Sequence, residues 1–307
     1  MAILKFGIPT GASGAQSDLG QALSGYSIEV MPRTAAKIPD FRAVLPQGTR
    51  VYIAHIDGTP IQDMVETAKR LRAEGFEAMP HIPARIVANR SELSDWIARY
   101  QGEAGVEQAL LLAGGVAKPK GGYHSSIQLL ETGCFDRAGF KRLHVAGHPE
   151  GNRDIDPDGS DTNVMAALNW KQSFSERSDA ETAIVTQFAF DAAPIMAWDK
   201  AIRAAGIHLP VHLGIAGPAR LQTLIKYAVT CGVGPSFRVL QNRARDVGNL
   251  LRQHEPTQLV QDIAEYRAKT PATLLTSFHI FPLGGFATAG TWAAHHLQRH
   301  QNAASQG

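Results

Sequence analysis

Cysteine is almost absent from this sequence. Only Cys134 and Cys231 occur among 307 residues, and they form no Cys-x-x-Cys pair. This excludes a disulfide framework and a cysteine-ligated zinc site, and it favours a reducing compartment. Charge of one sign is equally scarce, because the formal net charge is +2 and no run of five or more Lys and Arg residues occurs. Nucleic acid is therefore not expected as a partner, since its binding requires a basic face.

Long apolar runs are also missing. No stretch reaches the roughly 18 apolar residues that cross a bilayer, and the first residues, MAILKFGIPTGASG, have neither a basic leader nor a sustained apolar core. We therefore expect a cytoplasmic protein without a membrane partner. The 44% hydrophobic and 19% charged residues are typical of a globular protein. We expect one domain over residues 1–307, with a lead-in at 1–20 and a frayed tail at 301–307. The sequence does not decide between a monomer and a homo-oligomer.

Short runs rich in Val, Ile, Leu and Phe alternate with longer amphipathic stretches, a pattern typical of parallel strands covered by helices. The eight candidate strands span 26–31, 50–55, 76–82, 107–115, 141–147, 183–190, 209–215 and 274–281. Their number and order predict an α/β fold, the closed (β/α)8 or TIM barrel. A doubly wound open sheet is the alternative, because periodicity does not show closure.

Helices are predicted between these strands where apolar residues recur at helical spacing. Those at 61–75, 91–105 and 194–206 end in glycine, which supplies the left-handed turn into the next strand. A fourth, at 218–232, has Pro218 in its first turn, where a missing N–H costs nothing. The segment 34–49 predicts only a weak helix.

In such a barrel the catalytic groups lie where the strands end. The residues at these positions are Glu29, His55, Asp57, His81, Gly114, Gly115, His148, Glu150, Gln187, Asp191 and His279. The amide of Gln187 suits a bidentate pair with the edge of a heterocycle, although neighbouring backbone can satisfy it equally well. No strand end has a lysine, so Schiff-base aldolase chemistry is not expected.

Glu29 stands between Ile28 and Val30, which places its carboxylate inside the barrel if these neighbours face outward. Burial raises the pKa of a carboxyl group, as a proton donor near neutral pH requires. We therefore predict a general acid at Glu29. The alternative is a structural Glu paired with Arg33 or Lys171.

A metal-dependent barrel hydrolase or lyase is an alternative function. Its ligands would be the strand-end histidines His55, His81, His148 and His279. Metal sites in barrels usually take two ligands from one short motif, but no His-x-His occurs. The pairs His144/His148 and His208/His212 lie in predicted strands rather than on the helix that this spacing needs. We therefore predict no metal site.

The segment TGASGAQ at 10–16 is similar to the Gly-rich turn of a dinucleotide-binding Rossmann fold. The dehydrogenases that begin in this way also need a Tyr-x-x-x-Lys pair, and no tyrosine of this sequence has Lys four residues later. We therefore interpret the segment as part of the lead-in.

The order of the motifs resembles methylenetetrahydrofolate reductase of the single-domain bacterial type, from about Tyr26 to Trp292. The most specific elements are SIEVMPR at 27–33, similar to the family's first-strand Glu followed by Pro and a basic residue, and TQFAFD at 186–191. Supporting motifs are PHI at 80–82, AGHPEG at 146–151, LNWK at 168–171 and LGI with a small-residue turn at 213–217.

The resemblance implies an oxidoreductase of one-carbon metabolism. It would interconvert 5,10-methylenetetrahydrofolate and 5-methyltetrahydrofolate by hydride transfer through FAD, with NADH or NADPH as reductant. Glu29 would be the general acid and Gln187 would bind the pterin. The other folate-side residues would be Asp57, Phe188, His279 and Leu221, which takes the place of an aromatic gate. The flavin side would comprise His55, His81, Gly114, Gly115, Ala146, His148, Glu150, Asn169 and Lys171.

Departures from the family pattern predict weak cofactor binding. The fourth strand ends in Ala113-Gly114-Gly115 where the family has Arg-Gly-Asp, and His148 replaces a Tyr. Ser173 and Gly285 stand where the family has basic residues. A lost hydrogen bond to a charged group costs about 1.5–3 kcal/mol, so FAD or folate should bind more weakly unless Asp57 or Glu150 substitutes. A flavin-independent folate oxidoreductase and a folate-binding protein without turnover therefore stay open.

Overall fold

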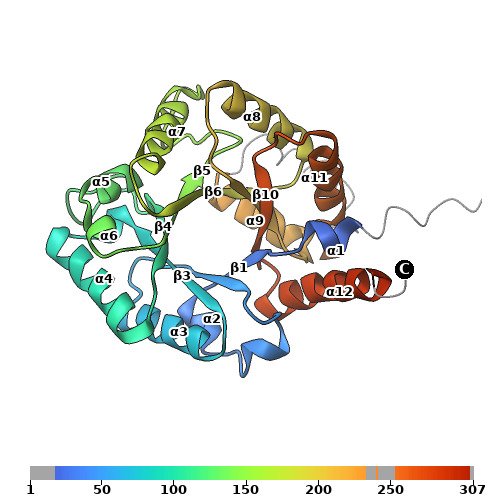
Figure 1. Cartoon of the computed structure of the whole chain (residues 1–307), viewed down its shortest axis with the longest axis horizontal. Coiled ribbons are helices and arrows are strands. Elements are labelled where there is room, and N and C mark those ends of the chain that lie inside the picture. The colour runs from blue at the N-terminus through green and yellow to red at the C-terminus, as the bar shows by residue number, and fades with distance from the viewer. Residues whose placement is uncertain (1–17, 233–239, 241–252, 305–307) are drawn as a thin grey trace, which may run out of the picture.

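The structure is a computed structural model, and it describes residues 18–232, Leu240 and 253–304. Eight strands are all parallel and close into a barrel in the order β1-β10-β7-β6-β5-β4-β3-β2, with helices around the outside (Figure 1). The predicted (β/α)8 barrel is confirmed, and the pairing of the last strand with the first excludes the open sheet. The Gly-rich segment 10–16 lies outside the described residues.

The barrel strands match the predicted ones to within a few residues. They are β1 (Ser27–Val30), β2 (Arg50–Ile53), β3 (Glu77–Pro83), β4 (Gln108–Leu112), β5 (Arg142–Gly147), β6 (Glu181–Ala189), β7 (Val211–Ala216) and β10 (Leu275–Phe281). Two further short strands, β8 (Ala219–Arg220) and β9 (Gln253–His254), pair antiparallel with each other outside the barrel.

The longer helices are α3 (Ile61–Ala73), α4 (Arg90–Ala104), α7 (Thr162–Ser175), α8 (Ala192–Ala204), α9 (Leu221–Thr230), α11 (Thr257–Lys269) and α12 (Phe286–Ala304). The shorter ones are α1 (Asp18–Ala22), α2 (Pro32–Ala35), α5 (Ser126–Glu131), α6 (Cys134–Arg137) and the 3-10 helices η1 (Phe41–Ala43) and η2 (Ala84–Ile86). The sequence explains the bounds of α4. Asn89 accepts a hydrogen bond from the Glu92 N–H at its start, and Gly105 ends it with a φ of 61°.

Two local predictions need correction. Within 34–49 only the end of α2 and the short η1 form, because Pro39 and Pro46 interrupt any longer helix. Pro218 precedes β8 rather than opening a helix, and α9 begins only at Leu221. Helix α12 ends at Ala304, and the last three residues of the tail predicted at 301–307 lie outside the described residues.

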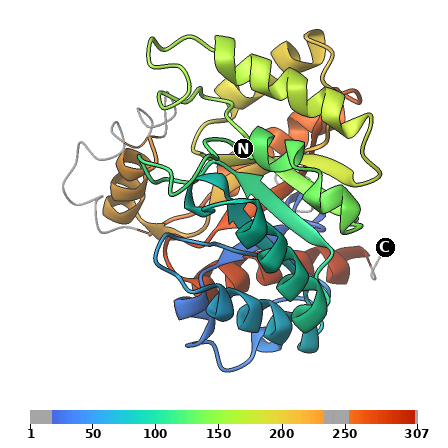
Figure 2. The same ribbon diagram turned by 90° about the vertical axis from the view of Figure 1, so that its left-hand side faces the viewer.

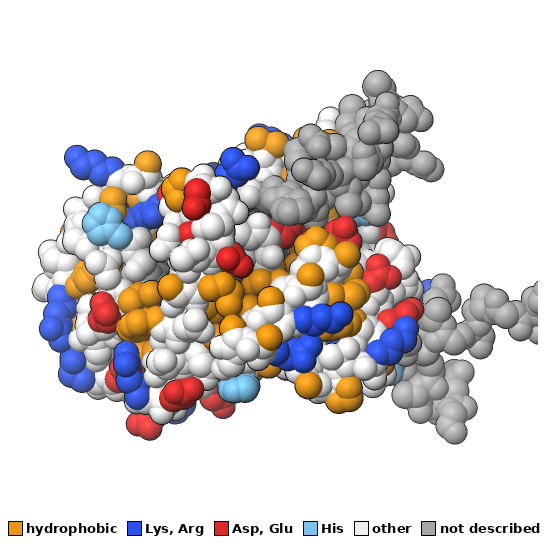
Figure 3. Space-filling model, turned by 90° about the horizontal axis from the view of Figure 1, so that it is seen from above, with side chains coloured by type: hydrophobic (Ala, Val, Ile, Leu, Met, Phe, Trp, Pro, Cys, Tyr) orange, Lys and Arg blue, Asp and Glu red, His pale blue; other side chains and the backbone are white. Residues whose placement is uncertain are grey.

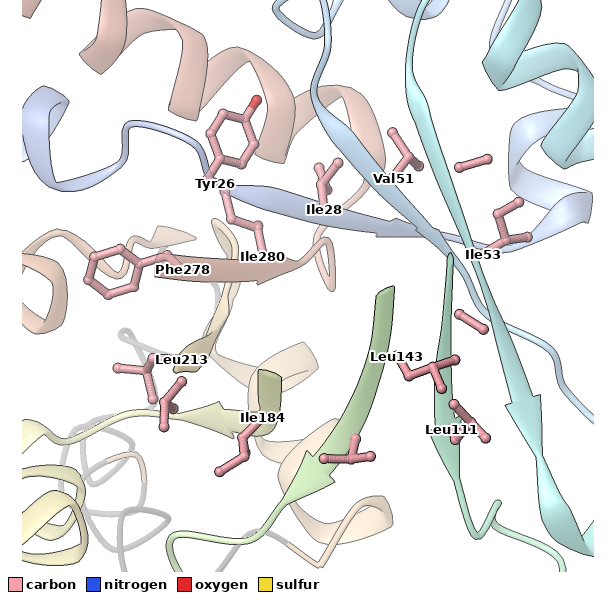
Figure 4. Packing of buried hydrophobic residues seen from close by; sticks show 14 of the residues in the cluster. Tyr26, Ile28, Val51, Ile53, Leu111, Leu143, Ile184, Leu213, Phe278 and Ile280 are labelled. Carbon is pink, nitrogen blue, oxygen red and sulfur yellow. The ribbon is translucent and has the colours of Figure 1, made fainter. Parts of the chain in front are cut away.

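The strands alternate between two environments. Ile28, Val51, Leu143 and Ile280 lie on the outer faces of the strands, in the main core beneath the helices (Figure 4). A separate small cluster of Tyr52, Met79, Leu110 and Val185 lies inside the barrel. This alternation is the one expected of a closed barrel, and it means that Glu29, which lies between outward-facing Ile28 and Val30, faces the interior.

Helix α9 follows β7 and the short strand β8, and it lies at the carboxyl-terminal end of the barrel, which we call the mouth. It overlaps the strands in the view along the barrel (Figure 1) and projects at the left in the side view (Figure 2). On the face shown in Figure 3, basic and acidic side chains are spread around a band of apolar ones. Within the described ranges, no helix combines the length and apolar character needed to cross a membrane.

Candidate active site

Glu29 lies inside the barrel at the mouth, as its place between two outward-facing residues predicts. Its side chain is 21% exposed, and its Oε2 atom lies 3.5 Å from Nε2 of His81 and 3.9 Å from Nε2 of His279. These histidines come from β3 and β10, so the barrel brings together groups far apart in the sequence. We call Glu29, His81 and His279 the acid–imidazole group.

The predicted rise in the pKa of Glu29 is wrong. Burial does raise this pKa, but the nearby imidazoles of His279 and His81 outweigh burial, and the pKa is lowered. Glu29 is therefore a carboxylate at rest near neutral pH. The alternative partners do not pair with it either, because Lys171 bonds elsewhere and Arg33 is exposed.

The two imidazoles differ in their surroundings. Burial lowers the pKa of His81 to about 4, although the charge of Glu29 acts in the opposite direction. His279 is fully buried, and its Nδ1 atom lies 2.9 Å from the Ser27 hydroxyl oxygen. His81 is therefore a neutral ring near neutral pH. The ring of His279 is held in position by the contact of its Nδ1 atom with Ser27.

Gln187 lies where the pairing of β6 with β7 shifts in register, between Val185 and Phe188. Its side-chain oxygen accepts a hydrogen bond of 3.1 Å from the Phe188 N–H. Thr186 fixes this irregularity, because its hydroxyl donates to the Gln187 carbonyl at 2.8 Å and accepts from the Gly214 N–H at 2.9 Å. The amide oxygen of Gln187 thus already accepts one backbone hydrogen bond and has a second lone pair for a ligand.

Phe188 and Leu221 are both buried in one apolar cluster that also contains Phe190 and Ala216. Phe188 packs edge-on against Phe281 of β10, with ring centroids 5.3 Å apart. Leu221, at the start of α9, is only 4% exposed. Its side chain is therefore packed within this cluster.

Lys171 of α7 is buried at the end of β5. Its Nζ atom donates to the Ala146 carbonyl at 2.8 Å, and burial lowers its pKa to about 8. His148 follows the same strand. Its Nδ1 atom lies 3.3 Å from the Asn152 amide, and burial, with the nearby Lys171 charge, lowers its pKa to about 4. Asn169, two positions before Lys171 on α7, is exposed, so the structure does not bring these two side chains together.

The ends of β2 and β4 contribute less to the mouth. His55 Nε2 lies 3.0 Å from the Thr59 carbonyl, with its ring 4.9 Å from that of Trp96. Asp57 is exposed and forms an ion pair of 2.5 Å with Lys120 in the loop after β4. It therefore stands apart from the acid–imidazole group. Glu150, in the loop after β5, is partly buried.

The two glycines after β4 differ in the room around them. Gly114 has a φ of 91°, and a Cβ atom there lies 2.9 Å from Cβ of Pro83. Gly115 is exposed, and a Cβ atom there meets nothing within 4 Å. Only the second position has space for the side chain that the family pattern leads one to expect. Gly285, where that pattern has an Arg, has a φ of 116°, which strains any side chain.

The four-histidine metal set is not assembled. His81 and His279 approach Glu29, but His55 and His148 are engaged elsewhere. In the part of the chain that the structure describes, no group of three or more His, Cys, Asp and Glu is arranged to hold a metal ion.

A cavity of about 150 Å³ lies beside the barrel interior, between the ends of β6 and β7 and the start of α11. Asp191 lines it and also caps α8, because its carboxylate accepts a hydrogen bond of 3.1 Å from the Ala193 N–H. The acid–imidazole group does not line this cavity, so we place the site at the mouth, where the titratable groups converge.

Sequence reasoning missed the groups beneath Glu29. Inside the barrel, the Tyr52 hydroxyl lies 2.5 Å from Nδ1 of His144, and the His144 ring centroid is 4.8 Å from that of His212. The ring of Tyr52 lies 4.4 Å from that of His279. The alternation of β2, β5 and β7 places these residues inward, and this was the available indication.

The fold and the acid–imidazole group define a class: a (β/α)8 barrel with acid–base groups at its mouth. No family model matches the chain. Among solved structures it is similar to an uncharacterised protein from Clostridium thermocellum that binds two copies of 5-methyl-5,6,7,8-tetrahydrofolic acid. The TM-score is 0.56 at 10% sequence identity, and the match covers 94% of this chain and 99% of that chain.

Proposed function

We propose that this protein binds a reduced folate at the mouth of its barrel and interconverts its 5,10-methylene and 5-methyl forms by hydride transfer. FAD is the proposed carrier of the hydride, and NADH or NADPH the reductant. The observation that supports this best is the place of Glu29, a partly exposed carboxylate at the mouth of a barrel similar to that of a folate-binding protein. The motif resemblance in β1 and β6 points to the same chemistry.

Glu29 has two tasks in this reaction. As a carboxylate it accepts a hydrogen bond from an N–H of the folate ring system. Opening the methylene bridge then needs a proton on the folate amine, which a positioned acid supplies. A bound ligand removes water from the mouth, and this desolvation raises the pKa of Glu29 toward the range of a proton donor.

The residues at the mouth fit the ring of a flavin better than its diphosphate. The neutral imidazoles of His81 and His148 suit the edge of a flavin ring, and the buried amine of Lys171 suits an anionic or carbonyl oxygen. The end of β4, with Ala113 and Gly115, offers no charge. FAD, when bound, would supply the redox chemistry, and this chain would hold it weakly.

The test is an assay of both directions. Purified protein with added FAD should oxidise NADH or NADPH in the presence of 5,10-methylenetetrahydrofolate. It should also oxidise 5-methyltetrahydrofolate with an artificial electron acceptor. The absence of both reactions contradicts the proposal.

Two other outcomes favour the alternatives. Turnover by protein that binds no flavin in calorimetry indicates a flavin-independent folate oxidoreductase. Binding of reduced folate without any redox change indicates a folate-binding protein.

A further inference from the structure

Several polar side chains lie in the interior of this barrel. Such interiors are usually filled by branched apolar residues, but here β1, β2, β5, β7 and β10 each place a polar side chain inward. These side chains are Ser27, Tyr52, His144, His212 and His279, which we call the polar column. Burying polar groups costs free energy unless they find partners, so the partners of the column are informative.

Two hydrogen-bonded pairs lie in the column, and the first of them approaches Glu29. His279 presents Nε2 to Glu29 at 3.9 Å and Nδ1 to the Ser27 hydroxyl at 2.9 Å. Beneath them, the Tyr52 hydroxyl lies 2.5 Å from Nδ1 of His144. The ring of His279 is thus anchored at one nitrogen and faces the carboxylate with the other.

Glu29, His279 and Ser27 are the three residue types of a serine hydrolase. In this barrel, however, the serine is the buried member and the carboxylate is the exposed one. The Ser27 residue is 1% exposed, whereas the Glu29 side chain is 21% exposed. A nucleophilic serine must reach the substrate, and here only the carboxylate does. This arrangement therefore suits proton transfer to and from Glu29 rather than attack by Ser27.

Both imidazoles beside Glu29 are candidates for its proton partner. A protonated imidazole has two N–H donors, and when buried it needs two acceptors. His279 has the Ser27 oxygen 2.9 Å from Nδ1, and Glu29 lies 3.9 Å from its Nε2. His81 lies nearer to Glu29, at 3.5 Å, and is the competing partner that the experiment must distinguish. The other titratable groups near Glu29 and His279 include Tyr52, His144, His212 and Cys231. Burial and the Glu29 charge raise the pKa of Cys231.

We propose that His279, held by Ser27, is the proton partner of Glu29. The Nε2–H bond of the His279 imidazolium breaks as an O–H bond forms on Glu29, and that O–H bond breaks as an N–H bond forms on the folate amine. One proton moves, the imidazolium becomes neutral, and the charge ends on the substrate. The reverse reaction returns the proton by the same path. The identity of the substrate in this inference rests on the proposed function. The effect of His279 on the titration of Glu29 does not depend on that function.

The experiment has one part that needs no substrate. Carboxyl-labelled glutamate lets NMR follow the titration of Glu29, whose resonance is identified by its loss in Glu29→Gln. His279→Gln and the milder Ser27→Ala should each move the titration to higher pH, by roughly one unit for the former. The control His208→Gln, at an exposed position before β7, should leave it unchanged. An unchanged titration in His279→Gln, or an equal shift in His81→Gln, overturns the pairing.

The second part uses the folate half-reaction. His279→Gln should slow it by about 10²-fold and alter its pH profile, with flavin reduction by NADH or NADPH retained. The double variant with Glu29→Gln should be no slower than Glu29→Gln alone, because residues that act as one unit are not additive. Full additivity overturns the relay. A further outcome is that the wild-type protein and all variants show no folate turnover, while the Glu29 titrations shift as expected. In that case the proposed function is wrong, but the effect of His279 on Glu29 is confirmed.

Discussion

The Nζ atom of Lys171 in α7 donates a hydrogen bond of 2.8 Å to the carbonyl oxygen of Ala146 in β5. Burial lowers the pKa of this lysine to about 8, against an ordinary value of about 10.4. Between these values the unfolded chain binds more protons than the folded one. The free energy of unfolding therefore rises with pH in this window, and the penalty is complete below it.

Lys171→Met should accordingly stabilise the protein near pH 7. The relieved penalty is about 3 kcal/mol, reduced by about 1 kcal/mol for the unpaired Ala146 carbonyl. Urea unfolding should show this gain shrinking as the pH approaches roughly 10. Lys200→Met, at an exposed position on α8, is the matched control. A gain that does not depend on pH contradicts the buried-charge explanation.

Gly115→Asp should restore a charge that the family pattern leads one to expect at the end of β4. The side chain has open space there, so the unfolding free energy should hardly change. Under the proposed function, binding of FAD or folate should tighten by up to about tenfold in calorimetry. Gly114→Asp is the contrasting variant, because its φ of 91° and the contact with Pro83 should destabilise the protein by about 1–3 kcal/mol.

The buried histidines should make the protein sensitive to acid. Burial lowers the pKa of His81, His148 and His212 to about 4, below the ordinary value of about 6.5. The unfolded chain therefore binds more protons in this window, and stability should fall as the pH drops from about 6.5 to about 4. His212→Leu should make the fall shallower in urea melts, while the exposed His208→Leu should not. Equal slopes in all three proteins rule out His212 as a contributor.

Glu29→Gln should retain flavin reduction and lose folate turnover, because an amide cannot transfer the proton that opens the methylene bridge. We expect a loss of about 10²-fold or more in the folate half-reaction. Glu131→Gln, at an exposed position on α5, is the control. Wild-type folate turnover in Glu29→Gln would make this residue structural.

FAD should be substoichiometric in the purified protein, and its content should rise when FAD is added. The reason is the lack of charge at Ala113, Gly115 and Ser173, which leaves the diphosphate with few partners. Absorbance of the isolated protein and calorimetry with FAD measure both quantities. Tight, stoichiometric FAD in the isolated protein would contradict the expected weak binding.

The barrel was predictable because each buried strand is a short apolar run and each helix has its own periodicity. Both features are local. The place of Glu29 inside the barrel was predictable for the same reason, from Ile28 and Val30 alone. Pro218 was misplaced because β8 pairs with β9, which lies more than thirty positions further along the chain.

The sign of the Glu29 pKa shift was not predictable, since it depends on His81 and His279. These residues come from other strands, and their distances to Glu29 follow from strand register and barrel closure rather than from spacing. The contact of Tyr52 with His144 was missed for the same reason.

The pairing of β1 with β10, which closes the barrel, affects when the site can form during synthesis of the chain. Ser27 is aligned with His279 in this pairing, and their side chains bond although 252 positions separate them. A nascent chain on the ribosome therefore has no imidazole of β10 beside Glu29 until the final strand has emerged and docked. Under the proposed function, a ligand bound at Glu29 would favour the closed barrel by mass action, so substrate would also stabilise the newly completed protein.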